Sequence, residues 1–378
     1  MMAHYLVTGG CGFIGSHLCE ELLARGHRVR VLDNLSTGLR ANLAPRARLM
    51  VGSVTDQHAV EAALSGVDGC FHLAAIASVE RCNLAWVETH QTNVSGMIVV
   101  LEAVRRKASK QDGAVAIPVV YASSAAVYGV PEICPLPENA ALRPISAYGA
   151  DKLGCELHAR VAGQVHGLPT TGLRFFNVFG PRQDPKSPYS GVISIFCQRV
   201  SDGQPVTING NGRQTRDFVH VSDVVAALIA AQDAATTAAP VFNICTGQPT
   251  SVLQLATMIS RICGQSLTIQ NSPVRMGDIQ HSLGVPLRSR QALRLGPPLA
   301  LEEGLRSVIA WIRAGAPCIN GSKWAKPRGG RPDGARRQEA NAGVDRPRSD
   351  QPREGRLSQA RDQSPTQPAA KDQVRALR

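Results

Sequence analysis

Residues 5–15 read YLVTGGCGFIG. The first four of these residues favour a strand, and glycines follow at positions 9, 10, 12 and 15. The next residues, SHLCEELLARG, place Leu18, Leu22 and Leu23 on one face of a helix. The stretch therefore predicts a strand, a tight glycine turn and a helix.

The glycine turn is expected to bind a diphosphate. Glycine at positions 9 and 12 lets the backbone turn sharply and lets a ligand approach the main chain. The N–H groups of the first helical turn, at Phe13 and Ile14, then point at the phosphate oxygens. Gly15 allows the helix to pack closely on the strand.

An acidic residue at the end of the second predicted strand narrows the choice of ligand. Residues 27–34, HRVRVLDN, predict a strand that ends at Asp33. A carboxylate there accepts hydrogen bonds from the adenine ribose hydroxyls of NAD and repels the 2′-phosphate of NADP. The alternative is a solvated Asp in a turn, but the glycine turn upstream favours NAD binding.

Charge is distributed unevenly along the 378-residue chain, which is long enough for one large core or two domains. The formal net charge is +12, yet residues 320–378 hold 14 Lys/Arg and 7 Asp/Glu. This segment has few apolar residues, so we expect a disordered, solvated tail. The basic balance therefore does not indicate nucleic-acid binding by the folded part, and we expect none.

The ten cysteines are scattered, without a C-x-x-C pair or a cluster with histidines. This pattern argues against a metal site and against a disulfide framework, and it suits a reducing cytoplasm. The first strand begins near residue 4, and no apolar run reaches membrane-spanning length. We therefore expect a soluble cytoplasmic protein without a signal peptide or a membrane partner.

Polar residues follow the next predicted strands. After a strand at 47–51, Asp56 is placed either to contact the adenine or to cap the following helix. The segment 69–75, GCFHLAA, predicts a buried strand whose small final residues leave room for the diphosphate, and His72 is expected to be a packed polar residue. Asn93 is a polar residue on a predicted apolar helix at 87–104 and a candidate cofactor contact.

The second stretch that predicts chemistry is a Tyr–Lys pair. Residues 117–122 predict a strand that runs into SSAAVYG, so Ser123 and Ser124 lie at the carboxyl end of a parallel strand, where ligands bind. Residues 146–163 predict a helix on which Tyr148 and Lys152 share a face. The lysine ammonium favours the tyrosine phenolate, which can take a proton from a sugar hydroxyl while Ser124 bonds the same oxygen.

These pieces together resemble the extended short-chain dehydrogenase/reductase family, specifically its NAD-dependent nucleotide-sugar epimerases and dehydratases. The resemblance covers residues 3–315 and rests on TGGCGFIG, HLAA, SSAAVYG, YGADK, LRFFNVFGPRQ, RDFVHVSD and RMGD. It implies an α/β fold with a Rossmann doubly wound parallel sheet and a smaller α/β C-terminal substrate domain. The expected domains are 1–172 for NAD and 173–317 for the nucleotide sugar, followed by the tail at 318–378. The sheet of the second region is expected to be partly shared with the first domain.

The resemblance also implies functional residues. The implied catalytic residues are Ser124, Tyr148 and Lys152. The implied NAD contacts are Gly9, Gly12, Phe13, Ile14, Gly15, Asp33, Asn34, Val54, Asp56, Leu73, Ala74, Ala75, Asn93, Tyr148 and Lys152. The implied substrate contacts are Ser78, Ser123, Ser124, Asn177, Arg216, Arg275, Asp278 and Ser282.

The substrate contacts have chemical reasons and structural alternatives. Arg216 and Arg275 match the family's phosphate-binding arginines, whose guanidinium groups suit phosphate oxygens, and Asp278 matches a position near the uridine ribose. Each arginine could instead form a surface ion pair, and Asn177 could merely satisfy a bend in the backbone. Residues 207–223 predict a hairpin with an Asn-Gly turn that leads into a helix.

Three positions favour a particular reaction and substrate within the family. Dehydratases carry acidic residues where this chain has Ala125 and Ala126, so the resemblance favours an isomerase that epimerises the 4-position of a UDP-hexose with bound NAD. Ser282 replaces a bulky tyrosine of epimerases restricted to unacetylated hexoses, which favours UDP-GlcNAc/UDP-GalNAc, with UDP-Glc/UDP-Gal as a second pair. The alternatives are a decarboxylase, dehydratase or reductase on the same fold, or a non-catalytic NAD-binding protein. The family is commonly dimeric, through helices that correspond to 87–104 and 153–165.

Overall fold

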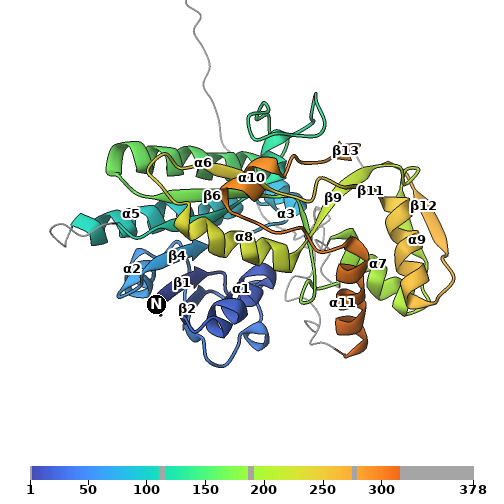
Figure 1. The fold of residues 1–378 in the computed structure, drawn as a ribbon, viewed down its shortest axis with the longest axis horizontal. Coiled ribbons are helices and arrows are strands. Elements are labelled where there is room, and N and C mark those ends of the chain that lie inside the picture. The colour runs from blue at the N-terminus through green and yellow to red at the C-terminus, as the bar shows by residue number, and fades with distance from the viewer. Residues whose placement is uncertain (1, 110–115, 186–190, 275–278, 316–378) are drawn as a thin grey trace, which may run out of the picture. The chain divides into compact units, whose positions relative to one another are not determined.

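A computed structural model of the chain describes residues 2–109, 116–185, 191–274 and 279–315. A seven-stranded parallel sheet forms the centre of the larger part of the molecule (Figure 1), in the order β10-β6-β5-β4-β1-β2-β3. Its strands are β1 (His4–Thr8), β2 (Arg28–Asp33), β3 (Arg48–Val51), β4 (Gly69–His72), β5 (Val119–Ser124), β6 (Thr170–Phe175) and β10 (Val241–Ile244). This strand order confirms the predicted doubly wound Rossmann fold, and the order reverses between β1 and β4, where a ligand crevice is expected.

Helices cover both faces of this sheet. Helices α1 (Phe13–Ala24) and α8 (Val221–Asp233) pack on one face, and α2 (Gln57–Leu64), α5 (Gly96–Ser109) and α6 (Ala147–His166) pack on the other. Successive residues of β1 serve the two faces, because Val7 joins the core under α1 and α8 while Leu6 joins the core under α2, α5 and α6. The predicted helix after the glycine turn is confirmed, with Leu18, Leu22 and Leu23 all buried.

The single helix predicted at 87–104 is interrupted. Its first part is α4 (Trp86–His90), followed by a π-helical turn, η2 (Gln91–Ser95), and then by α5. The turn contains Asn93, whose side chain bonds to a neighbouring loop. Such a π-turn changes the direction of the side chains it carries, which a simple 3.6-residue pattern does not predict. The remaining short elements of this half are η1 (Arg40–Asn42), α3 (Val79–Leu84) and η3 (Ala125–Tyr128).

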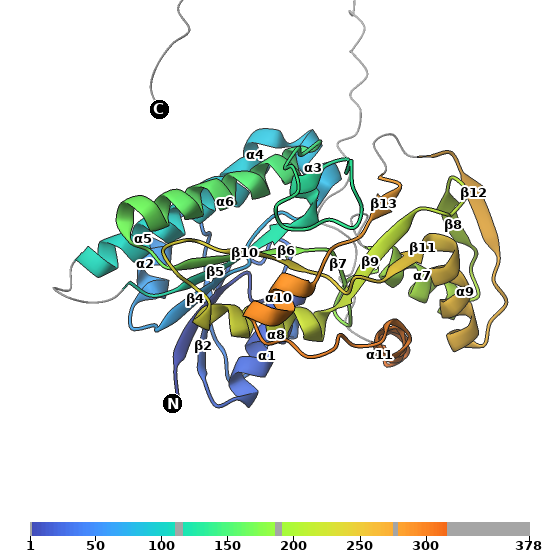
Figure 2. The ribbon, with the colours of Figure 1, turned by 45° about the horizontal axis from the view of Figure 1, so that its top comes forward.

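A smaller α/β assembly is formed by later residues (Figure 2). Strand β9 (Thr215–His220) pairs with β7 (Asn177–Phe179), β11 (Pro249–Ser251) and β13 (His281–Ser282). Strands β8 (Val206–Asn209) and β12 (Ile269–Ser272) form a separate parallel pair. Helices α7 (Val192–Ser201), α9 (Val252–Cys263) and α11 (Leu301–Arg313) share one apolar core with them, and α10 (Leu287–Ala292) lies against β10.

The predicted hairpin at 207–223 is wrong, although its helix is present as α8. Strands β8 and β9 flank the Asn-Gly turn but pair with different partners, β12 and the β7/β11/β13 group. The turn holds two glycines with positive φ, Gly210 at 70° and Gly212 at 72°, and Asn211 bonds the Arg213 N–H. Long-range pairing therefore overrides the local hairpin signal.

The two halves of the chain share the central sheet. The expected boundary at 172/173 falls inside β6, and β10, from the second half, extends the sheet beside β6. The predicted tail at 318–378 lies outside the described residues. Within the described ranges, no helix combines the length and the apolar character needed to cross a bilayer.

Candidate active site at the carboxyl edge of the sheet

The predicted Tyr–Lys pair lies on α6 beside the end of β5. Lys152 is buried, and its Nζ donates a hydrogen bond to the carbonyl oxygen of Ala122 at 2.9 Å. The same nitrogen lies 5.8 Å from the centre of the Tyr148 ring. Because Ala122 is two residues before Ser124, this bond brings the Tyr–Lys face of α6 to the strand end that carries Ser124.

Close packing brings the first turn of α6 against the turn that follows Ser124. A Cβ at Gly149 would lie only 2.5 Å from the carbonyl oxygen of Ala126, so glycine next to Tyr148 allows this approach. The hydroxyl of Ser124 accepts a hydrogen bond from the Ala126 N–H at 3.2 Å and caps η3. This hydroxyl still has its own proton to donate, and it is only partly buried.

The glycine turn fits a diphosphate. Helix α1 begins after Gly12 without a side-chain cap, and its first turn holds no acidic residue. By contrast, α2 and α6 are capped by Asp56 and Ser146. The first N–H groups of α1, including those of Phe13 and Ile14, are therefore left for an anionic ligand.

Two of the glycines are required by packing. A Cβ at Gly15 would lie 2.2 Å from the carbonyl oxygen of Gly9, and a Cβ at Gly9 would lie 2.8 Å from the Ala74 backbone. Gly9 also has a φ of +70°, which favours glycine. A Cβ at Gly12 would meet only the Gly9 carbonyl, at 3.2 Å. The loop is thus built from close backbone contacts, with space left at the start of α1.

Asp33 holds the glycine turn from the end of β2. Its carboxylate is buried and accepts hydrogen bonds from the Cys11 N–H at 2.9 Å and the Leu35 N–H at 2.8 Å. Each carboxylate oxygen has a second lone pair that remains for ribose hydroxyls. The neighbouring Asn34 is exposed, and its side chain bonds the Ser36 N–H. The geometry therefore fits the predicted adenine-ribose site.

Thr8, at the end of β1, forms hydrogen bonds with the end of β4 and with the loop that follows it. The Thr8 hydroxyl lies 2.9 Å from His72 Nδ1 and accepts hydrogen bonds from the N–H groups of Leu73 and Ala74. Burial, helped by the charge of Lys152, lowers the pKa of His72 to about 3. His72 is therefore a neutral, packed side chain, which confirms the sequence interpretation. The loop from Leu73 to Ala75 is partly exposed, as a cofactor passing over it requires.

The structure gives two predicted ligand contacts partners within the protein. Asn93 is buried, and its amide bonds both the N–H and the carbonyl of Ile76, at 2.8 and 3.3 Å. It thus supports the loop after β4. Ser123 is also buried, and its hydroxyl donates to Glu156 at 2.5 Å.

Three further predicted contacts have structural roles. Asp56 caps α2 by accepting hydrogen bonds from the His58 and Ala59 N–H groups. This is the capping alternative that the sequence left open. Ser78 caps α3 through the Arg81 N–H. Val54 is buried in the core under α2 and α5.

Three predicted substrate contacts come together in the small sheet around β9. Ser282 pairs in register with Arg216, and Asn177 pairs with Phe218, two residues further along β9. Because residues in register and residues two apart lie on the same face of a sheet, these three side chains share one face. Asn177 also donates to the Asp217 carbonyl at 3.2 Å, which is the structural role considered for it. Arg275 and Asp278 lie outside the described residues.

Asp217 was not predicted, but it organises this region from the opposite face of β9. Its fully buried carboxylate accepts hydrogen bonds from the Thr246 N–H and hydroxyl, the Gly247 N–H and the Gly284 N–H. Burial raises its pKa, although these hydrogen bonds oppose the shift. The sequence offers a signal for this role of Asp217. An acidic residue within an apolar strand is buried, and a buried carboxylate needs hydrogen-bond donors.

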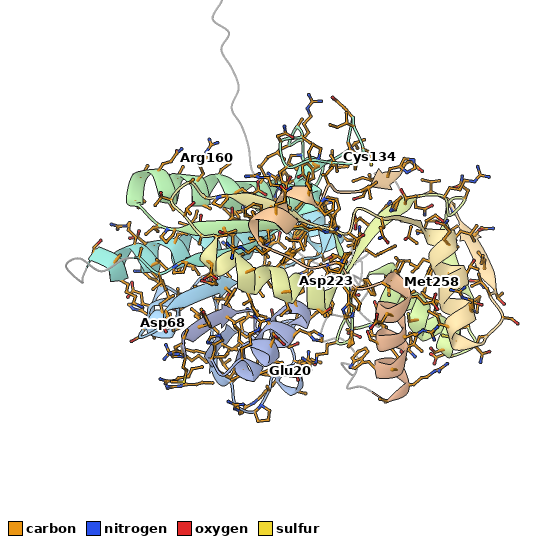
Figure 3. The ribbon with its side chains drawn as sticks, in the orientation of Figure 1. Glu20, Asp68, Cys134, Arg160, Asp223 and Met258 are labelled. Carbon is orange, nitrogen blue, oxygen red and sulfur yellow. The ribbon has the colours of Figure 1, made fainter. Side chains whose placement is uncertain are left out.

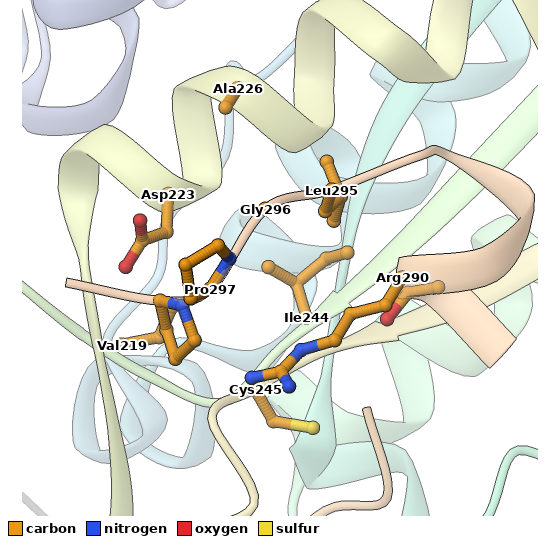
Figure 4. Close-up of a pocket in the computed structure, with 11 residues that line it drawn as sticks. Val219, Asp223, Ala226, Ile244, Cys245, Arg290, Leu295, Gly296 and Pro297 are labelled. Carbon is orange, nitrogen blue, oxygen red and sulfur yellow. The ribbon is translucent and has the colours of Figure 1, made fainter. Parts of the chain in front are cut away.

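A separate cavity of about 160 Å³ lies between α8, β10 and the segment after α10 (Figure 4). It is lined by Val219, Asp223, Ile244, Cys245, Arg290 and Pro297, among others. None of the predicted site residues lines it, and one oxygen of Asp223 is already bonded to the Leu299 N–H. Within the described part of the chain, no group of three or more His, Cys, Asp or Glu side chains is positioned to hold a metal ion.

The chain is similar in sequence and in fold to known proteins. The sequence pattern of the NAD dependent epimerase/dehydratase family matches residues 5–245. A UDP-glucose 4-epimerase from Mycolicibacterium smegmatis is 35% identical over 315 residues, which cover 82% of this chain and 98% of the relative.

Two solved structures are similar over almost their whole length. UDP-glucose 4-epimerase from Thermotoga maritima, with UDP-glucose, has a TM-score of 0.77 and 35% identity, and the match covers 82% of this chain and 99% of that one. UDP-N-acetylglucosamine 4-epimerase from Methanobrevibacter ruminantium, in complex with UDP-N-acetylmuramic acid, has a TM-score of 0.77 and 32% identity, with 83% and 99% covered. The chain therefore belongs to the NAD-dependent epimerase/dehydratase family, and NAD is its cofactor.

Proposed function

We propose that this enzyme is an isomerase that interconverts the 4-epimers of a UDP-hexose. The observation that supports this most is the position of Lys152, bonded to β5 at Ala122 and adjacent to Tyr148. Ala122 lies two residues before Ser124 on β5, so the pair is near the carboxyl edge of the sheet, where ligands of such folds bind.

In this reaction Tyr148 takes the proton of the 4-hydroxyl group of the sugar. The Lys152 ammonium stabilises the phenolate that this step requires, and the Ser124 hydroxyl donates to the same sugar oxygen. The glycine turn and Asp33 would hold NAD, which would supply reversible hydride transfer at the sugar carbon. Tyr148 gives the proton back after the keto sugar has turned its other face, so the residues end in their starting state.

The residues after Ser124 favour epimerisation over dehydration. Ala125 and Ala126 form the turn η3, and neither can protonate a departing hydroxyl group. Expulsion of water from a sugar needs such an acid, whereas epimerisation needs only one residue that removes and returns a proton. The same absence argues against a decarboxylase that uses an acid at this position.

We propose UDP-GlcNAc and UDP-GalNAc as the preferred pair, with UDP-Glc and UDP-Gal also accepted. Ser282 is small and pairs in register with Arg216, the expected diphosphate contact. A small side chain there leaves room for an N-acetyl group. Similarity to the UDP-N-acetylglucosamine 4-epimerase supports this choice.

We further propose that the enzyme is a cytoplasmic homodimer. Leu157, Val161 and Val165 form an apolar stripe on α6 and are 50%, 49% and 67% exposed, and Trp86 and Val87 on α4 are 65% and 75% exposed. Helices α3, α4 and α6 contact one another, and side chains stand out from α6 into solvent, among them Arg160 (Figures 2 and 3). Such a patch suits burial against a second copy. The nine cysteines of the described residues are all free, which suits a reducing compartment.

One experiment tests the proposed reaction. The purified protein, loaded with NAD, is incubated with UDP-GlcNAc and separately with UDP-Glc, and the sugar anomeric signals are followed by NMR. The 4-epimer should form from UDP-GlcNAc, and more slowly from UDP-Glc. Formation of a dehydrated sugar, or no conversion of any UDP-hexose, would contradict the proposal.

A further inference from the structure

Glu156 lies on the same face of α6 as Tyr148 and Lys152, at a spacing of four residues from each to the next. Its carboxylate accepts the Ser123 hydroxyl at 2.5 Å, while Lys152 donates to the Ala122 carbonyl at 2.9 Å. Two successive turns of α6 therefore hold two successive residues of β5. The next residue of that strand is Ser124.

Glu156 is itself held by a buried arginine. Arg174 on β6 bonds both carboxylate oxygens, through Nε at 2.8 Å and Nη2 at 2.7 Å, and both side chains are about 5% exposed. Arg174 pairs in register with Ser123 on one side and with Asn243 of β10 on the other. The ion pair thus joins α6 to β6, next to the end of β5 that carries Ser124.

The same arginine holds the far end of the turn after Ser124. Its Nη1 donates to the Tyr128 hydroxyl at 2.8 Å and to the Glu138 carbonyl at 2.9 Å, and Tyr128 donates to Asn243 at 2.6 Å. Since η3 runs from Ala125 to Tyr128, the segment that begins with Ser124 is tied down at both ends.

We propose that Glu156 and Arg174 are positioning residues that set the distance between Ser124 and the Tyr148–Lys152 pair. Neither side chain touches the sugar. The pair acts on the reaction because a displacement of about 1 Å between a reacting group and its partner can cost on the order of 100-fold in rate. The link to catalysis rests on the proposed epimerase activity, but the ordering of residues 123–128 does not.

A double variant separates positioning from stability. Removing one partner leaves an unpaired buried charge, whereas replacing both with apolar residues of similar volume is often neutral for stability. Glu156→Met/Arg174→Met should therefore lose less stability than either single variant, although Ser123 and the Glu138 carbonyl lose a hydrogen-bond partner. We expect its kcat to fall about 10- to 100-fold while KM for the UDP-sugar stays unchanged, because the nucleotide is bound elsewhere. A double variant with wild-type kcat would overturn the proposal.

A gentler variant covers the case in which the double variant does not fold. Ser123→Ala removes only the hydroxyl that joins β5 to Glu156 and leaves the ion pair intact. We expect kcat to fall about 10-fold with KM unchanged, and an unchanged kcat would overturn the proposal. Glu102→Gln is the matched control, because Glu102 on α5 makes the same forked contact with Arg105 away from the site, at 2.7 Å for each bond. Its kcat should remain that of the wild type.

Hydrogen exchange supplies a readout that does not depend on turnover. In the double variant and in Ser123→Ala, peptides that cover residues 123–128 should exchange faster, while peptides from β1 and α1 should not change. Unchanged exchange at 123–128 would overturn the positioning role. If the wild-type protein converts no UDP-hexose, the proposed function fails, and the exchange result still decides the role of this pair.

Discussion

Lys152 Nζ and the carbonyl oxygen of Ala122 are joined by a hydrogen bond of 2.9 Å that connects α6 to β5. The two residues belong to elements about 30 positions apart in the chain. Their contact places a cation next to Tyr148 and two residues from Ser124. Substitutions of the residues of this site can therefore test the role of each side chain by itself.

Tyr148→Phe should remove the proton-transferring group and leave the binding surfaces in place. We expect kcat to fall by about 10²- to 10⁴-fold, with UDP and NAD affinities close to those of the wild type. Turnover followed by NMR and binding followed by calorimetry measure the two effects. Tyr5→Phe is the control, since the Tyr5 ring packs on His27 and Phe71 away from the site. Retained turnover in Tyr148→Phe would show that another group moves the proton.

Gly15→Ala should disrupt the glycine turn. The new Cβ would lie 2.2 Å from the Gly9 carbonyl oxygen, so the backbone must shift. We expect a loss of about 1–3 kcal/mol of stability and at least a 10-fold weaker NAD affinity, measured by thermal melting and NAD titration. Gly296→Ala is the control, because a Cβ there would meet no atom within 4 Å. Unchanged NAD affinity in Gly15→Ala would place the diphosphate elsewhere.

Ser282→Tyr should narrow the substrate range. A ring beside Arg216 would fill the space that the proposal gives to the N-acetyl group. We expect kcat/KM for UDP-GlcNAc to fall at least 10-fold, which corresponds to about 1.4 kcal/mol, while kcat/KM for UDP-Glc changes little. Ser282→Ala should leave both substrates unaffected. Equal losses for both substrates in Ser282→Tyr would argue against an acetyl pocket at this position.

His72 should make folding sensitive to acid. Burial lowers its pKa from 6.5 to about 3 in the folded state, so between these values the unfolded chain binds a proton that the folded chain does not. The contribution of this site to stability is complete above pH 6.5 and is lost as the pH falls toward 3, by about 1.4 kcal/mol per pH unit. Urea unfolding gives the free energy of unfolding at each pH between about 4 and 6. This free energy should change less steeply with pH for His72→Asn than for the wild type. The same pH dependence of stability in His72→Asn and in the wild type would contradict this account.

Leu157→Glu/Val161→Glu should prevent dimerisation. Both side chains are about half exposed on α6 and would become charged within the proposed interface. Light scattering after gel filtration should report a monomer for this variant and a dimer for the wild type. Val51→Glu, on the exposed edge strand β3, is the control and should remain dimeric. A monomeric wild type, or a dimeric double variant, would rule out this interface.

Much of the site was predictable because its signals are local. The glycine turn, Asp33 and the Tyr148–Lys152 spacing each lie within one element or at one turn, where residue type and backbone conformation are directly coupled. The less reliable predictions concern polar side chains whose partners are distant in the chain. The sequence predicts Asn93 and Ser123 as ligand contacts, because Asn93 lies on a predicted helix and Ser123 at the end of a predicted strand. Their actual partners, Ile76 and Glu156, are 17 and 33 positions away.

The sequence by itself determined the glycine turn and the Tyr148–Lys152 spacing, because residue type and local backbone conformation are coupled. The doubly wound sheet and NAD followed from the resemblance that these motifs carry. Tertiary structure decided that β8 and β9 do not pair with each other as a hairpin. Each pairs with strands from other parts of the chain. It also decided which polar groups face a ligand and which satisfy buried neighbours, as Arg174 does for Glu156. The physical reason is that a buried polar atom must find a partner wherever the fold brings one, and that partner cannot be identified from spacing along the chain.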